Sequence, residues 1–82
     1  MKRYFYITFQ YINNNNTGYY ELDFISDAET PFNLAVIKKK AIDQIFKLRS
    51  YKLLPRQIII NYIHEFASEA DFNSFFQKPD PK

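Results

Sequence analysis

The 82-residue sequence has no cysteine, one glycine and one histidine. Without cysteine the chain can form neither disulfides nor a thiolate metal site, so its stability must come from the burial of apolar surface. A single histidine, His64, excludes a metal site built from several histidines. A single glycine excludes a glycine-rich phosphate-binding loop. The acidic residues show no cation-loop spacing either, so the sequence predicts neither a metal nor a cofactor.

The chain also lacks a long apolar run, because nothing in it approaches the roughly 20 apolar residues of a membrane-spanning helix. Residues 1–12 are interrupted by Thr8 and Gln10 and contain no small-residue cleavage site of a signal peptide. We therefore expect a cytoplasmic protein, in agreement with the absence of cysteine. Little alanine and glycine beside much isoleucine, lysine and asparagine is typical of AT-rich coding sequence, which hints at a microbial, phage or mobile-element origin.

Aromatic side chains are abundant, with nine Phe and seven Tyr among 46% hydrophobic residues. Each such ring buries roughly 150–250 Å², so a few of them can fill the core of a small domain. Composition and length predict one domain over residues 1–78. Residues 79–82, which contain Pro79 and Pro81, are expected to form a flexible C-terminal tail.

Two segments near the N-terminus, in which core-facing and outward-facing side chains alternate, predict a β-hairpin. Residues 3–12 would place four side chains toward the core, and residues 19–25 would form the returning strand. The intervening residues 13–18 contain four asparagines and Gly18, which we expect to supply left-handed turn conformations.

The middle of the chain predicts a long helix, with Thr30 as its N-cap and Pro31 as its first residue. At helical spacing one stripe faces the core, and we expect this helix to run to Arg49. The stripe comprises Leu34, Ile37, Ala41, Ile45 and Leu48, with Ile42 beside it.

A third strand is predicted over residues 57–65, and its apolar residues alternate onto both faces, as in a strand that is covered on both sides. Ile58, Ile60 and Tyr62 would share one face, and Ile59, Asn61 and Ile63 the other. Ser68 then resembles the start of a capping box that opens a short helix through about Gln77.

The element order β-β-α-β-α predicts an α+β fold with a three-stranded, mainly antiparallel sheet. Because the first strand is the longest and most apolar, we expect the order 2-1-3, in a split β-α-β arrangement. The long helix would cover one face of the sheet, and a short C-terminal helix would follow.

The sheet face away from the long helix is then rich in apolar side chains, which something should cover. Three covers are open: the C-terminal helix folding back, a second copy in a two-fold dimer, or a ligand such as another protein or stacked nucleobases. The candidate protein interface consists of Tyr4, Tyr6, Tyr19, Ile25, Ile59 and Ile63.

Positive charge is concentrated in one segment, since seven of the eleven cationic residues lie between Lys38 and Arg56, opposed there only by Asp43. Such a segment can meet nucleic acid or an acidic protein, or can simply be a solvated surface. The contact residues for an acidic partner or nucleic acid would be Lys39, Lys40, Lys47, Arg49, Lys52 and Arg56.

Catalysis has little support: the residue types of a Ser-His-Asp triad occur in the sequence, but no nucleophile motif accompanies His64. The sequence therefore favours a small non-enzymatic interaction or accessory protein that self-associates through its apolar sheet face. Its basic helix would meet an acidic partner. The alternative is a nucleic-acid-binding accessory protein that uses the Lys and Arg residues of 38–56. No small-molecule substrate and no membrane contact are expected.

Overall fold

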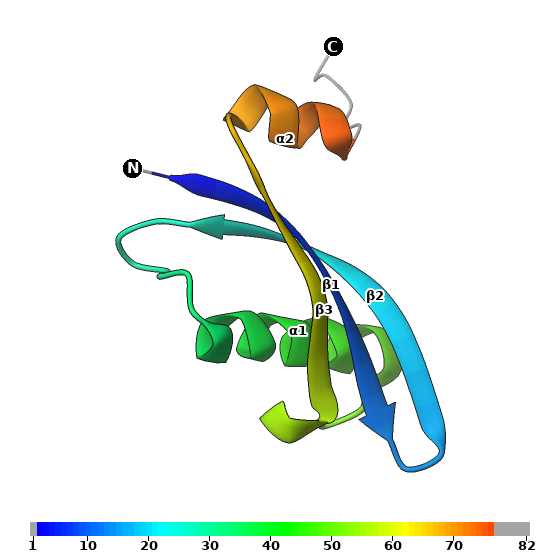
Figure 1. The fold of residues 1–82 in the computed structure, drawn as a ribbon. Helices are drawn as coiled ribbons and strands as arrows, with labels where there is room; N and C mark the ends of the chain where they lie inside the picture. Colours follow the sequence, from blue (N-terminus) through cyan, green and yellow to red (C-terminus); the bar gives the residue numbers. More distant parts are fainter. Residues whose placement is uncertain (1, 77–82) are drawn as a thin grey trace.

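A computed structural model describes residues 2–76 of the chain. The elements follow in the predicted order (Figure 1): β1 (Arg3–Asn13), β2 (Asn16–Ser26), α1 (Leu34–Arg49), a 3₁₀ turn η1 (Pro55–Gln57), β3 (Ile58–Phe66) and α2 (Glu69–Phe75). The sheet has the order β2-β1-β3, and both pairings are antiparallel. The α+β class, the order 2-1-3 and the short C-terminal helix are thus confirmed. The predicted tail, residues 79–82, and Gln77 lie outside the described residues.

The core lies between α1 and one face of the sheet, and every second side chain of β1 points into it. Phe5, Ile7, Phe9 and Tyr11 of β1 are buried there, together with Leu22 and Phe24 of β2. From α1 the buried residues are Ile37, Ala41 and Ile45. The period of two along β1 and the period of about 3.6 along α1 produce these two complementary faces.

The hairpin turn is tighter than predicted, because Asn13 pairs with Asn16 and only two residues form the turn. Asn14 adopts the left-handed conformation there, with φ of 57°. Gly18 instead lies within β2 opposite Tyr11, and its φ is not positive. A Cβ atom at this position would lie 2.2 Å from the Tyr11 ring, so the glycine leaves room for a buried aromatic side chain.

The long helix begins later than predicted, at Leu34 rather than Pro31. Asn33 is its N-cap and accepts a hydrogen bond from the Val36 amide at 2.9 Å. The preceding loop is held by Asp27, whose carboxylate accepts hydrogen bonds from the amides of Glu29 and Thr30. This loop places the Phe32 ring in a stacked position on the Phe5 ring, with ring centroids 4.1 Å apart.

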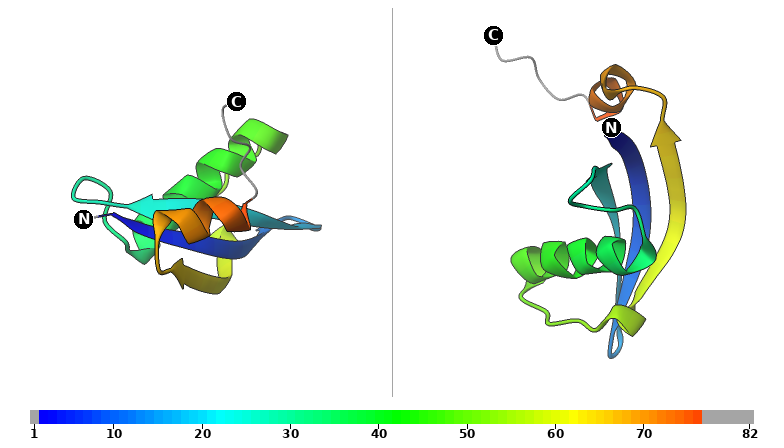
Figure 2. Two further views of the ribbon diagram at one scale, coloured as in Figure 1. Left: turned by 90° about the horizontal axis from the view of Figure 1, so that it is seen from above. Right: turned by 90° about the vertical axis from the view of Figure 1, so that its left-hand side faces the viewer.

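The helix α1 crosses the strands at a steep angle, and its C-terminal end stands away from the sheet (Figure 2). This placement explains why Leu48, near that end, is 57% exposed; Leu34, the first residue of the helix, is 56% exposed, so only the middle of the predicted stripe is buried. The other helix, α2, lies at the opposite end of the sheet, beside the start of β1 and the end of β3 (Figure 1).

A β-bulge interrupts the pairing of β3 with β1. Thr8 pairs with Tyr62 and Phe9 with Ile60, so Asn61 is an extra residue on β3. Because one extra residue reverses the alternation beyond it, the predicted faces of β3 hold only before Asn61. The predicted face of Ile63 is therefore wrong: it pairs with Ile7 and shares the α1 side of the sheet.

Candidate interaction surfaces

The C-terminal helix covers one end of the sheet face opposite α1, which we call the open face. Ser68 caps α2 by accepting a hydrogen bond from the Asp71 amide, and the capped helix places Phe72 against the sheet. The Phe72 ring lies 5.3 Å from Tyr4, and the Phe75 ring lies 4.7 Å from Tyr6. The first of the three predicted covers, the C-terminal helix, is therefore present at this end.

The rest of the open face is mixed in polarity. Each pairing register places three side chains in a row across the sheet, and Thr8 lies in a row with Glu21 and Tyr62. The Tyr6 hydroxyl donates a 2.7 Å hydrogen bond to the Glu21 carboxylate, which raises the pKa of Tyr6. Polar groups on β1 and β2 thus divide the apolar side chains of this face.

The six residues of the predicted protein interface do not form one surface. Tyr4 and Tyr6 contact α2, and Ile63 lies on the other face of the sheet. The remaining three are exposed on the open face, but Ile25 is opposite Tyr4, whereas Tyr19 and Ile59 flank Gln10 further along β1.

The predicted cationic residues remain available at the opposite end of the molecule. Among residues 2–76, the ion pair within 4.0 Å is Arg3 with Glu65, and it involves none of the cations of residues 38–56. Arg49 donates a 3.1 Å hydrogen bond to the Tyr20 hydroxyl, which raises the pKa of Arg49. Lys39, Lys40, Lys47, Arg49, Lys52 and Arg56 are all exposed, so the structure leaves these charges to solvent or to a partner.

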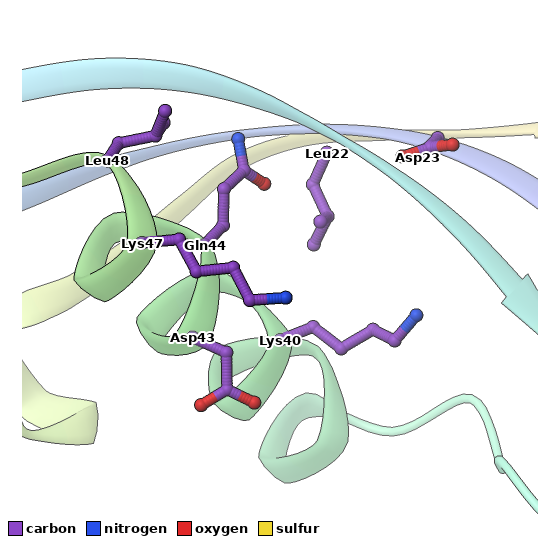
Figure 3. A pocket seen from close by; sticks show the side chains of 7 residues that line it. All are labelled: Leu22, Asp23, Lys40, Asp43, Gln44, Lys47 and Leu48. Carbon is purple, nitrogen blue, oxygen red and sulfur yellow. The ribbon is translucent and has the colours of Figure 1, made fainter.

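A groove runs between α1 and β2, with a volume of about 430 Å³. The middle of α1 is fixed there by Gln44, whose side-chain amide donates a 3.1 Å hydrogen bond to the Glu21 carbonyl. Figure 3 shows the Asp43 carboxylate turned to the side of the helix away from Leu22. The groove is lined by Leu22, Asp23, Lys40, Asp43, Gln44, Lys47 and Leu48.

This groove brings two of the predicted cations, Lys40 and Lys47, beside an apolar residue that was assigned to the core, Leu48. The Lys40 ammonium also lies 5.4 Å from the centre of the Phe24 ring. Helical spacing places Lys40, Lys47 and Leu48 on one side of α1, but the exposure of Leu48 depends on the angle at which α1 crosses the sheet. The exposure of Phe46, at 47%, adds a second apolar residue to the same helix.

One hollow beside α2 is lined by three residue types of a hydrolytic triad, His64, Asp71 and Ser74. No hydrogen bond between these three side chains is found, and the His64 ring instead packs edge-on against Phe66, 4.8 Å away. Nucleophilic catalysis requires a serine and a carboxylate within hydrogen-bond reach of the imidazole. The hollow therefore provides no argument for a catalytic role.

Residues 2–76 contain no cluster of three or more His, Cys, Asp or Glu side chains suited to a metal ion. Within the same residues, no helix has the length and apolar character that crossing a membrane requires. No protein-family model matches the chain, and searches of curated proteins and of solved structures found no match.

Proposed function

We propose that this chain is a non-enzymatic interaction protein that binds an acidic protein surface through the groove between α1 and β2. The observation that supports this most strongly is that α1 carries exposed apolar side chains beside exposed cations, none of which forms an ion pair within 4.0 Å among residues 2–76. Lys40 and Lys47 supply positive charge to a lining that also holds Asp23 and Asp43, and Leu48 supplies an apolar contact 57% exposed to solvent. A partner segment with carboxylates and apolar side chains would complement both.

A protein partner is favoured over nucleic acid by the apolar component. Affinity for the phosphate backbone of a duplex comes mainly from cations, so the exposed apolar side chains of Phe46 and Leu48 would add little binding free energy there. Single strands could stack on aromatic rings, but Tyr4 and Tyr6 lie on the face opposite α1 and contact α2, which leaves Phe46 as the exposed ring of α1. The cations and these rings therefore cannot line one nucleic-acid groove.

The proposal is tested with three labelled probes at equal net charge: a peptide of Glu and Leu, a peptide of Glu and Ser, and duplex DNA. We expect the Glu/Leu peptide to bind most tightly. Lys40→Glu combined with Lys47→Glu should weaken the binding of both peptides. Leu48→Ser should weaken only the Glu/Leu peptide, by about tenfold, because a buried Leu side chain contributes roughly 1.5–3 kcal/mol. Lys52→Glu combined with Arg56→Glu, outside the groove, is the charge-matched control.

Nucleic-acid binding remains the second candidate, because seven cations lie between Lys38 and Arg56 and lack a carboxylate partner among residues 2–76. It would replace the first proposal if DNA bound more tightly than either peptide and its affinity fell steeply with salt. The control pair at Lys52 and Arg56 would then weaken binding as much as the groove variants, since all phosphate contacts contribute.

A further inference from the structure

The two edges of the sheet differ in how they are shielded. The β2 edge lies beside α1, and Gln44 satisfies the Glu21 carbonyl on its outer side. α1 also contacts β3 across one face of the sheet, but no described element runs alongside the outer edge of β3 (Figure 2). Unshielded strand edges present free N–H and C=O groups that template pairing with another strand.

The side chains of β3 do not protect this edge. Residues 58–63 carry no charge, although charges are a common protection of edge strands. Three of their large apolar side chains are substantially exposed, namely Ile59, Tyr62 and Ile63. Further along, the Glu65 carboxylate is paired with the Arg3 guanidinium at 2.9 Å, so it adds little net charge. Ile58 is buried, but the middle of the strand has the composition of a covered strand and is left exposed by residues 2–76.

The pairing pattern identifies which backbone groups of β3 point outward. The Glu21 carbonyl points away from β1, because it accepts from Gln44. Its partner Thr8 must then direct its backbone groups toward β3, where it pairs with Tyr62. Since successive residues alternate in an antiparallel ladder, the N–H and C=O of Ile63 face away from β1.

We propose that a second copy of this chain pairs with β3 in antiparallel orientation and extends the sheet to six strands. An antiparallel strand pair is self-complementary about a two-fold axis perpendicular to the sheet, which favours a second copy over an unrelated partner. The axis leaves both α1 helices on the same side of the joined sheet. It also keeps Lys40 and Lys47 away from their copies, because they lie beside β2, at the opposite edge.

The mass in solution tests this proposal through sedimentation of the wild-type chain and two matched variants. The wild type should approach twice the 9.9 kDa of one chain as its concentration rises. Ile63→Lys should remain monomeric, because a lysine on an edge strand opposes pairing with another strand. Ile25→Lys makes the same change at an exposed position of β2 and should still dimerise. Circular dichroism establishes that both variants fold.

Amide hydrogen exchange tests the pairing at the backbone without any mutation. The Ile63 amide should become more protected as the concentration rises, whereas the Tyr62 amide, which faces β1, should be protected throughout. A wild type that stays monomeric at about 500 μM would overturn the proposal. So would a dimer that forms equally well with Ile63→Lys, or one whose Ile63 amide exchanges as fast as in dilute protein.

Discussion

At the scale of single residues, Gly18 was expected to be structurally important, but for a different reason from the one that the structure shows. Its place beside four asparagines predicts a turn glycine, but the turn is made by Asn14 and Asn15. What Gly18 supplies is space for Tyr11, which is buried and lies between the rings of Tyr20 and Tyr51. No local pattern reveals this, because Tyr11 and Gly18 meet only once the hairpin register is known.

Gly18→Ala should therefore destabilise the fold by about 1–3 kcal/mol, as expected for overpacking. The added Cβ would meet the Tyr11 ring, which cannot move freely between its aromatic neighbours. Urea unfolding measures the loss. Thr17→Ala, at the exposed neighbouring position, is the control and should change stability little. The explanation fails if Gly18→Ala is harmless, or if it costs the same when Tyr11 is also replaced by Leu.

The Arg3–Glu65 pair makes a prediction about pH. The guanidinium donates to the carboxylate and lowers the pKa of Glu65. A depressed pKa in the folded state stabilises the fold above the ordinary glutamate pKa, and this contribution is lost as the pH falls through the folded value. NMR titration should find the Glu65 pKa below its ordinary value and find it restored by Arg3→Gln. An unchanged value in that variant would exclude the pair as the cause.

At the scale of elements, the sequence predicts the type of each helix and strand better than its ends and faces. The end of α1 at Arg49 is confirmed, but its start depends on Asn33, one of several residues able to cap a helix. Thr30 has the same capping chemistry, so only the loop held by Asp27 decides between them. The faces of β3 depend on the bulge at Asn61, whose one sequence signal is a polar residue within an apolar run.

The placement of α1 predicts unequal effects for two residues of the same helical stripe. Ile45→Ala should cost about 2–5 kcal/mol, because Ile45 is 0% exposed. Leu48→Ala should cost far less, because its side chain projects into the groove beside β2. Thermal or urea unfolding of the two variants measures the difference. Equal losses would mean that the C-terminal end of α1 lies flat on the sheet.

At the scale of the whole molecule, the element order and one long apolar strand suffice to predict the topology. A central β1 pairs with both other strands, as its composition indicates, although β1 and β2 are equally long at 11 residues each. The surfaces are less predictable, since they depend on how far each helix extends over the sheet. Folding of α2 over Tyr4 and Tyr6 removes part of the predicted interface, and the tilt of α1 creates a groove that no single segment of sequence contains.

Charge is also organised at this scale. The cations of α1 and of the segment that follows it lie at one end of the molecule, and α2, with Glu69 and Asp71 in its first turn, lies at the other (Figure 1). Such a separation would orient the protein toward the acidic surface of the proposed partner before contact and would accelerate association at low salt. The exposed apolar side chains on α1 would then hold the complex after the encounter.

The most direct measurement of the proposed function is an NMR titration of the labelled protein with the Glu/Leu peptide. We expect saturable amide shifts centred on Gln44, Lys47 and Leu48 of α1 and on Leu22 of β2, with the open face around Thr8 unchanged. Shifts confined to the open face, or none at peptide concentrations near 1 mM, where only about 4 kcal/mol of binding free energy is needed, would contradict it.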